Sequence, residues 1–344
     1  MKKTILALTI PALFATSASA VTVYSDEGAQ VDIYGRVQFE AGEMHFKKTG
    51  VSPNQVTTNQ AQDFGGEGEA RLGVNVKYML NNDVDLIGKL EWQVTAEGDN
   101  ATGSDDISAR YAWAGFRFMD TTELTFGRSQ DPLAQSIYLG DIFNLFGAKT
   151  SYSSGDFEVS DKTDDQVRLS YANNGLDLRS AYAFSDKEKN TVGVNTGLEN
   201  QYTLSAGYTF PVGVGLVASY QKQEFGNTED LDVWFAGANY SIDGFYLAGL
   251  YTEKTKDYVA GELDAKGYEF TATYNVDAWT LLAQYAKEEQ ERAGNLSDID
   301  SVDAVTLGVQ YDLTAKAKLY AEYEINDDDA DNDDLYGMGI QYNF

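Results

Sequence analysis

Apolar and polar residues alternate strictly over the last nine positions of the chain. Tyr336, Met338, Ile340, Tyr342 and Phe344 interleave with small or polar residues. A period of two places these five side chains on one face of a β-strand. A terminal strand frays unless neighbouring structure holds it. We therefore expect this strand to pair within a sheet on both of its sides.

The same alternation recurs along the whole chain. Clear segments lie at 31–39, 70–78, 84–94, 202–210, 234–240, 268–276, 279–285, 305–311 and 319–325. Weaker segments lie at 107–118, 123–128, 166–172, 176–184, 212–221 and 245–252. With the terminal strand the pattern predicts about sixteen strands, an even number as a closed up-and-down barrel requires.

Two lengths of connection alternate between these strands. Short turns lie at 81–83, 119–122, 173–175 and 241–244. Long polar loops lie near 41–66, 95–106, 129–164, 185–200, 222–231, 252–266, 287–301 and 326–334. Short turns at one rim and long loops at the other are typical of an outer-membrane barrel. Aromatic residues at the ends of apolar faces, such as Tyr202 and Phe210, are typical of the membrane interfaces.

The fold class follows from hydrogen bonding. In hydrocarbon every backbone N–H and C=O must be paired, so a membrane-spanning sheet closes on itself. A cylinder of about sixteen strands is too wide for side chains to fill. We predict an all-β protein, a transmembrane antiparallel β-barrel with a water-filled interior.

Composition and the N-terminus agree with an exported β-protein. The chain has no Cys, four Pro, 32 Gly and 23 Tyr, which excludes disulfides and suits strands joined by turns. Lys2 and Lys3 precede an apolar run from 5 to 14, and Ala18-Ser19-Ala20 follows. This order predicts a cleavable signal peptide at 1–20 and a barrel domain at 21–344.

The charge is strongly negative. Without Lys2 and Lys3 the mature chain has 54 acidic and 23 basic residues, an excess of 31 negative charges. Nucleic acid is therefore not an expected partner. The acidic segment 326–334 lacks the central Gly and terminal Glu of a calcium loop, so we predict a solvated rim and no metal or cofactor site. Loose divalent cations bridging this rim to lipopolysaccharide phosphates stay an open alternative.

Four short segments carry a family resemblance: 31–36, 69–73, 124–128 and 342–344. In their order along the chain they resemble the general diffusion porins of Gram-negative bacteria, of the Vibrio type. The resemblance covers the whole mature chain. It implies a homotrimer of sixteen-stranded barrels in outer-membrane lipid and lipopolysaccharide. Each barrel would pass small hydrophilic solutes and ions and be narrowed by a long third loop folded into the pore.

The resemblance also implies a ladder of basic residues on the pore wall. By position these are Arg36, Arg71, Arg110 and Arg168. The alternation independently points each of them away from its apolar neighbours and into the barrel. Lys89 and Arg179 share this inward parity and are secondary candidates. The alternation does not decide the direction of Arg128, which shares parity with Leu124 and Phe126.

The third loop, at about 129–164, would supply acidic residues facing the ladder. Candidates are Asp131, Asp141, Asp156, Glu158 and Asp161, and Asp141 best matches the constriction segment of the family. The family has a Pro-Glu pair where this chain has Asn144-Leu145, so one expected acid is missing. Facing charges create a field across the pore. From the acidic excess we predict a mild preference for cations.

Three other functions compete with the channel. An enzyme is not expected, because the sole histidine, His45, stands in a loop without a recognisable nucleophile motif. A substrate-specific sugar channel would want inward aromatic residues, of which Tyr34 and Tyr320 are the clearer examples. An adhesin or receptor built on the loops stays open.

Overall fold

A computed structural model describes residues 20–49, 58–61, 63–95, 107–152, 157, 159–184, 197–226, 229–258, 261–291, 297–329 and 333–344. The expected signal peptide lies outside the described residues, apart from its last position. No helix in these ranges is long and apolar enough to cross a membrane.

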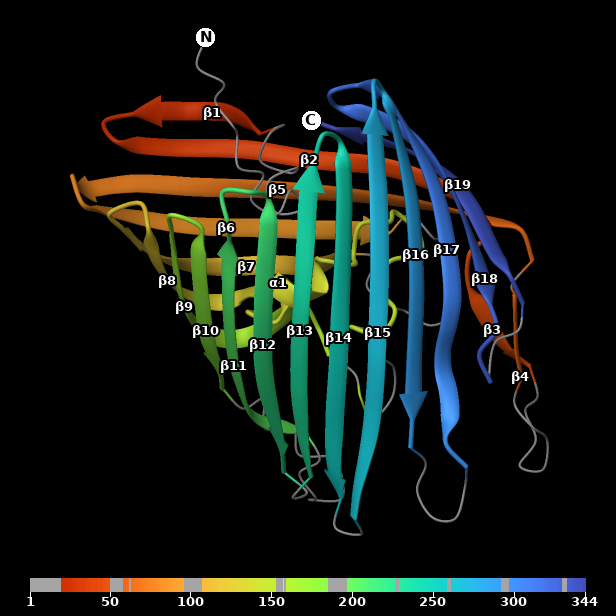
Figure 1. Ribbon diagram of the computed structural model, residues 1–344. Helices are drawn as coiled ribbons and strands as arrows, with labels where there is room; N and C mark the ends of the chain where they lie inside the picture. The colour runs from red at the N-terminus through yellow and green to blue at the C-terminus, as the bar shows by residue number, and fades with distance from the viewer. Residues whose placement is uncertain are drawn as a thin grey trace.

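The strands form a closed antiparallel barrel of sixteen strands, as the alternation predicted (Figure 1). Each strand pairs with the next along the chain, and the last pairs with the first. The barrel strands are β2 (Ala29–Glu43), β5 (Gly65–Asn81), β6 (Val84–Thr95), β7 (Ile107–Phe118), β8 (Thr122–Gln130), β9 (Lys162–Asn173), β10 (Leu176–Ala183), β11 (Leu198–Thr209), β12 (Val214–Phe225), β13 (Asp230–Ile242), β14 (Phe245–Tyr258), β15 (Gly261–Val276), β16 (Trp279–Gln290), β17 (Ile299–Thr314), β18 (Ala317–Asn326) and β19 (Leu335–Asn343).

The C-terminal strand closes the barrel. β19 pairs with β18 on one side and β2 on the other, so Tyr342 lies between Ala317 and Val37. The backbones of Phe344 and Gly35 exchange two hydrogen bonds of 3.0 and 3.1 Å. The prediction of a strand paired on both sides is confirmed. A short strand, β1 (Val21–Asp26), pairs with the beginning of β2.

The two rims differ as predicted, with one correction. The short turns lie at the end of the barrel where the chain terminates (Figure 1). The long loops expected at 222–231 and 252–266 are wrong, because β12 to β15 continue through most of these residues. The polar residues there belong to paired strands, as Lys254 opposite Ala265 shows. Their polarity reflects a wet lumen and an aqueous rim. In the first long connection, β3 (Phe46–Thr49) and β4 (Thr58–Ala61) form a small hairpin.

The alternation divides side chains between outside and inside. On β11, Leu204 is 57% exposed on the outer face and its neighbour Thr203 is 1% exposed on the inner face. Leu307 on β17 and Phe270 on β15 are likewise exposed. Large exposed apolar side chains around a closed sheet form the surface that faces lipid.

The main apolar core lies inside the barrel. The connection between β8 and β9, called loop 3 here, contains the short helix α1 (Ala134–Ile137) and folds inward (Figure 1). Its apolar side chains pack on inward residues of the wall. The cluster contains Leu133, Ile137 and Leu139 from loop 3 and Val217, Leu231, Val233, Phe235 and Leu250 from β12 to β14.

The lipid-facing role of the outer residues is testable. Replacing Leu307 with Arg should reduce the free energy of unfolding by about 2–4 kcal/mol, because a charge near the bilayer midplane is desolvated. The matched control is Gln310→Arg on the inner face of the same strand, where Gln310 bonds Asp312. Urea-induced unfolding in lipid vesicles measures both. Equal losses for the two variants would contradict the assignment of faces.

Candidate pore constriction

Loop 3 is anchored at its root by a buried carboxylate. Asp131 accepts hydrogen bonds from the backbone N–H of Leu133 at 2.8 Å and from Thr163, Gln201 and Thr203. The side chain is fully buried, and this burial raises the pKa of Asp131. The sequence placed Asp131 among the acids facing the ladder. In the structure it lies between loop and wall, because its four donors surround it there, and this corrects the expectation.

The middle of the loop is held by wall residues of β15 and β16. Glu269 accepts the backbone N–H groups of Thr150 at 2.6 Å and Ser151 at 3.2 Å. The amide of Gln284 donates to the carbonyl of Gly140 at 2.9 Å. These contacts satisfy polar groups of an irregular segment that is buried inside the barrel.

The tip of the loop is held by Glu322 of β18. Its carboxylate accepts the backbone N–H groups of Asn144, Leu145 and Phe146 at 2.7, 2.8 and 3.1 Å, and the Asn144 side chain at 3.0 Å. A proline at 144 would lack the N–H. The Asn144-Leu145 pair, which departs from the family pattern, thus supplies donors to a carboxylate on the wall. Phe146 also packs with Met44 and Leu335.

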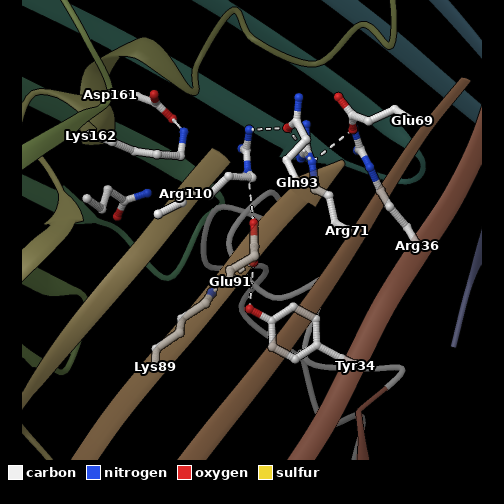
Figure 2. A network of polar contacts seen from close by, with 12 residues as sticks. Tyr34, Arg36, Glu69, Arg71, Lys89, Glu91, Gln93, Arg110, Asp161 and Lys162 are labelled. Carbon is white, nitrogen blue, oxygen red and sulfur yellow. Dashed lines mark hydrogen bonds and ion pairs between the residues drawn. The ribbon is translucent and has the colours of Figure 1, made fainter. Parts of the chain in front are cut away.

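Three of the four predicted wall arginines gather on β2, β5 and β7 (Figure 2). Arg36 lies 2.6 Å and Arg71 2.9 Å from the same carboxylate oxygen of Glu69. Arg110 lies 2.8 Å from Glu91 of β6. Gln93 accepts from Arg71 at 3.0 Å and from Arg110 at 2.9 Å. The result is one continuous network in which carboxylates neutralise arginines.

Sequence reasoning missed the two carboxylates of this network. Glu69 and Glu91 have the same inward parity as the arginines, since each alternates with an apolar residue, so the signal was present. Arg110 lies at a register shift opposite Glu91 and Trp92, and such a bulge re-aims a side chain. The pairing itself depends on strand register, which alternation does not give.

Lys89 extends the network, and its inward parity agrees with its position here. Its ammonium lies 3.7 Å from Glu91, 5.2 Å from the ring centre of Tyr34 and 4.3 Å from that of Tyr111. Tyr34 donates to Glu91 at 2.6 Å, and Tyr320 donates to Glu40 at 2.5 Å. Both tyrosines are buried inside the barrel, as the alternation indicated.

The loop side presents a smaller set of charges. Asp161 forms an ion pair with Lys162 and accepts from Tyr138 at 2.7 Å, beside Arg110 (Figure 2). Burial opposes ionisation, but Lys162 and the hydrogen bonds outweigh it and lower the pKa of Asp161. Burial, with the charges of Asp161 and Glu269, raises the pKa of Asp141 to about 6.

The remaining candidates lie elsewhere. Arg168 is opposite Thr125 and outside the network of Figure 2, and Arg179 pairs with Asp177 at 2.6 Å. At Gly127, φ is +114° and the register shifts, which interrupts the alternation before Arg128. Arg128 pairs with Asp164 at 2.8 Å. Asp156 and Glu158 lie outside the described residues.

No histidine- or carboxylate-rich group that could hold a metal occurs within the described ranges. His45 lies 2.7 Å from Glu67, and both side chains are exposed.

Comparison with known proteins decides the family. A family model described as Gram-negative porin matches residues 7–333. The chain belongs to this family. The outer membrane porin F of Escherichia coli K12 is 26% identical to this porin over 381 aligned positions that span both chains completely. The barrel is therefore an outer-membrane channel.

Solved structures agree on the fold. OmpF of Salmonella typhi, in complex with daunomycin, matches with a TM-score of 0.75 at 18% identity, covering 94% of this porin and 100% of that chain. The anion-selective porin of Comamonas acidovorans matches with a TM-score of 0.71 at 16% identity, covering 92% and 100%. At these identities the likeness shows the fold alone and leaves ion selectivity to the residues of the pore.

The raised pKa of Asp141 predicts a pH-dependent selectivity. Below pH 6 the carboxyl is mostly protonated and neutral, and above pH 6 it carries a charge. The preference for K⁺ over Cl⁻ should therefore rise between about pH 5 and pH 7. Zero-current potentials under a KCl gradient measure this. Asp141→Asn should flatten the profile, and an unchanged slope in that variant would refute the assignment.

The Glu322 contacts predict control of loop position. In Glu322→Ala the three backbone N–H groups at the loop tip lose their acceptor, and each such loss costs roughly 1–3 kcal/mol. We expect larger single-channel conductance and greater open-channel noise in planar bilayers. Gln341→Ala is the control, because among the described residues this inward side chain bonds Asn343 and not loop 3. Identical recordings for both variants would exclude a holding role for Glu322.

Proposed function

We propose that this porin forms a water-filled channel for passive diffusion of small hydrophilic solutes and ions, with a mild preference for cations. One observation carries the selectivity: Arg36, Arg71 and Arg110 are each ion-paired with Glu69 or Glu91. Paired arginines attract passing anions less than free ones, because the field of the pair falls off faster than that of a single charge.

The charge of the whole chain supports the same direction. The mature sequence has 54 − 23 = 31 excess negative charges. An acidic chain raises the local concentration of cations and lowers that of anions. The wall arginines keep the preference mild, since Arg71 and Arg36 share one carboxylate.

A substrate-specific sugar channel is less well supported. Sugars stack on exposed aromatic faces, whereas Lys89 lies over the rings of Tyr34 and Tyr111. A cation on the ring competes with a solute for the same face. General diffusion therefore fits the constriction better than a sugar slide.

The proposal includes the wider setting that the family resemblance implies. We infer a homotrimer in outer-membrane lipid and lipopolysaccharide. The chain reaches this membrane after removal of the signal peptide at 1–20. A channel role without catalysis also fits His45, because its ring contacts the Glu67 carboxylate and both side chains are exposed. An adhesin or receptor role for the loops is compatible with the channel, but no contact among the described residues favours it.

The zero-current potential in a planar bilayer tests the selectivity. Purified trimer under a KCl gradient should give a stable conductance and a potential of the sign that marks K⁺ preference. In the double variant Glu69→Gln, Glu91→Gln the arginines lose their partners, and the potential should move toward the chloride side. Glu67→Gln is the control, because it removes an acidic charge at the rim that does not belong to the arginine network. Chloride preference in the unmodified protein would overturn the proposal.

A further inference from the structure

The tip of loop 3 has an apolar contact in addition to its contact with the Glu322 carboxylate. Leu145 and Phe146 pack with three residues from other parts of the chain, and these five form what we call the tip cluster: Met44, Ala61, Leu145, Phe146 and Leu335. Met44, Phe146 and Leu335 are 8%, 4% and 3% exposed. The contact therefore excludes water, although the lumen around it is wet.

Three segments that are remote in sequence meet in the tip cluster. Met44 and Ala61 belong to the connection between β2 and β5, which is called loop 1 here. Leu335 is the first residue of β19. The tip of loop 3 is therefore held by loop 1 as well as by the strands of the wall.

The wall leaves room for loop 1 and loop 3 to meet at Gly337 of β19. Gly337 points inward, since its neighbours Tyr336 and Met338 are exposed on the outer face. A Cβ atom at Gly337 would lie 2.7 Å from Cδ1 of Leu145 and 2.9 Å from Cγ of Met44. Both distances are shorter than van der Waals contact. The absence of a side chain at this position thus creates the space in which the tip cluster packs.

Loop 1 also contacts the rim of the barrel. The backbone N–H of Ala61 donates to the Asp333 carboxylate at 3.0 Å, and the ring centre of Phe64 is 6.5 Å from that of Tyr336. The hairpin of β3 and β4 lies at the rim of the long loops (Figure 1). In outer-membrane barrels this rim faces the outside of the cell. Loop 1 therefore connects the extracellular mouth with the tip cluster.

The position of the tip depends on such contacts because its backbone is irregular. Residues 141–148 form neither helix nor strand. A segment of this kind opens locally at low cost unless buried contacts oppose the opening. Removing buried methylene groups from a small cluster takes away contacts that the remaining side chains cannot fully replace.

We propose that loop 1 positions the tip of loop 3 through the tip cluster, so that a change made in loop 1 from outside the cell alters the conductance of the pore. Met44 is the positioning residue, because it is buried in the cluster and comes from loop 1 itself. The inference rests on the proposed channel function, and it adds to that function a route by which the extracellular surface acts on the constriction.

Modification of a single cysteine tests this coupling in one channel, before and after the reaction. The chain has no Cys, so Ala61→Cys supplies the only thiol of each protomer. A bulky uncharged maleimide added on the extracellular side of a planar bilayer should change the single-channel conductance in a step. Leu145→Ala in the same background should reduce this step, because it removes a loop 3 side chain from the cluster.

Two controls accompany the modification. The unmodified protein, which lacks a thiol, should show no step with the same reagent. Mass spectrometry verifies that Ala61→Cys has reacted. Unchanged conductance in the labelled Ala61→Cys trimer would overturn the coupling.

Met44→Ala tests the positioning residue without added bulk. Loss of this buried side chain should make brief excursions of the open-channel current about tenfold more frequent. Met338→Ala is the matched control, because Met338 is 55% exposed on the outer face of β19. Heat-modifiable mobility on gels verifies that each variant is folded. If the two variants give the same recordings, the coupling is wrong while the channel stands. A folded unmodified protein without conductance would overturn both.

Discussion

Backbone hydrogen bonding in hydrocarbon is the constraint on which the rest of this structure depends. An unpaired sheet edge in lipid leaves a row of unsatisfied polar groups, so β19 must meet β2. The exchange between Phe344 and Gly35 carries the pairing to the last residue. A closed sheet of this width cannot fill its interior with side chains. Its lumen is wet. Charged residues can therefore point inward there, whereas in lipid their desolvation would cost too much.

The wet lumen creates a second requirement, because loop 3 has only one short helix and must be held mainly by side chains of the wall. The wall meets it with carboxylates: Glu322 and Glu269 accept backbone N–H groups, and Asp131 caps the root. Asn144, at a position where the resemblance implies a proline, has a backbone N–H at the tip of the loop, and Glu322 accepts its hydrogen bond. In this porin one acid thus lies on the wall at the place where the loop lacks the expected one.

Local alternation predicted what depends on local geometry. All sixteen strands, the lipid face and the inward direction of Tyr34 and Tyr320 follow from a period of two. The loops expected at 222–231 and 252–266 were wrong because strand residues that face water on both sides resemble loop residues in composition. The burial of Asp131 could not be predicted, since its donors Gln201 and Thr203 are remote in sequence. Nor could the direction of Arg128, because a bulge at Gly127 changes the phase.

The stability of the pore wall requires its ion pairs, whatever their effect on selectivity. Arg36 and Arg71 are directly opposite in the register of β2 and β5, and like charges at that position destabilise a sheet. Glu69 contacts both guanidinium groups and offsets their repulsion. A wall that brings arginines together in this register therefore needs a carboxylate among them. The same carboxylate weakens the attraction for anions, so the cation preference that we propose has its physical basis in the packing of the arginines.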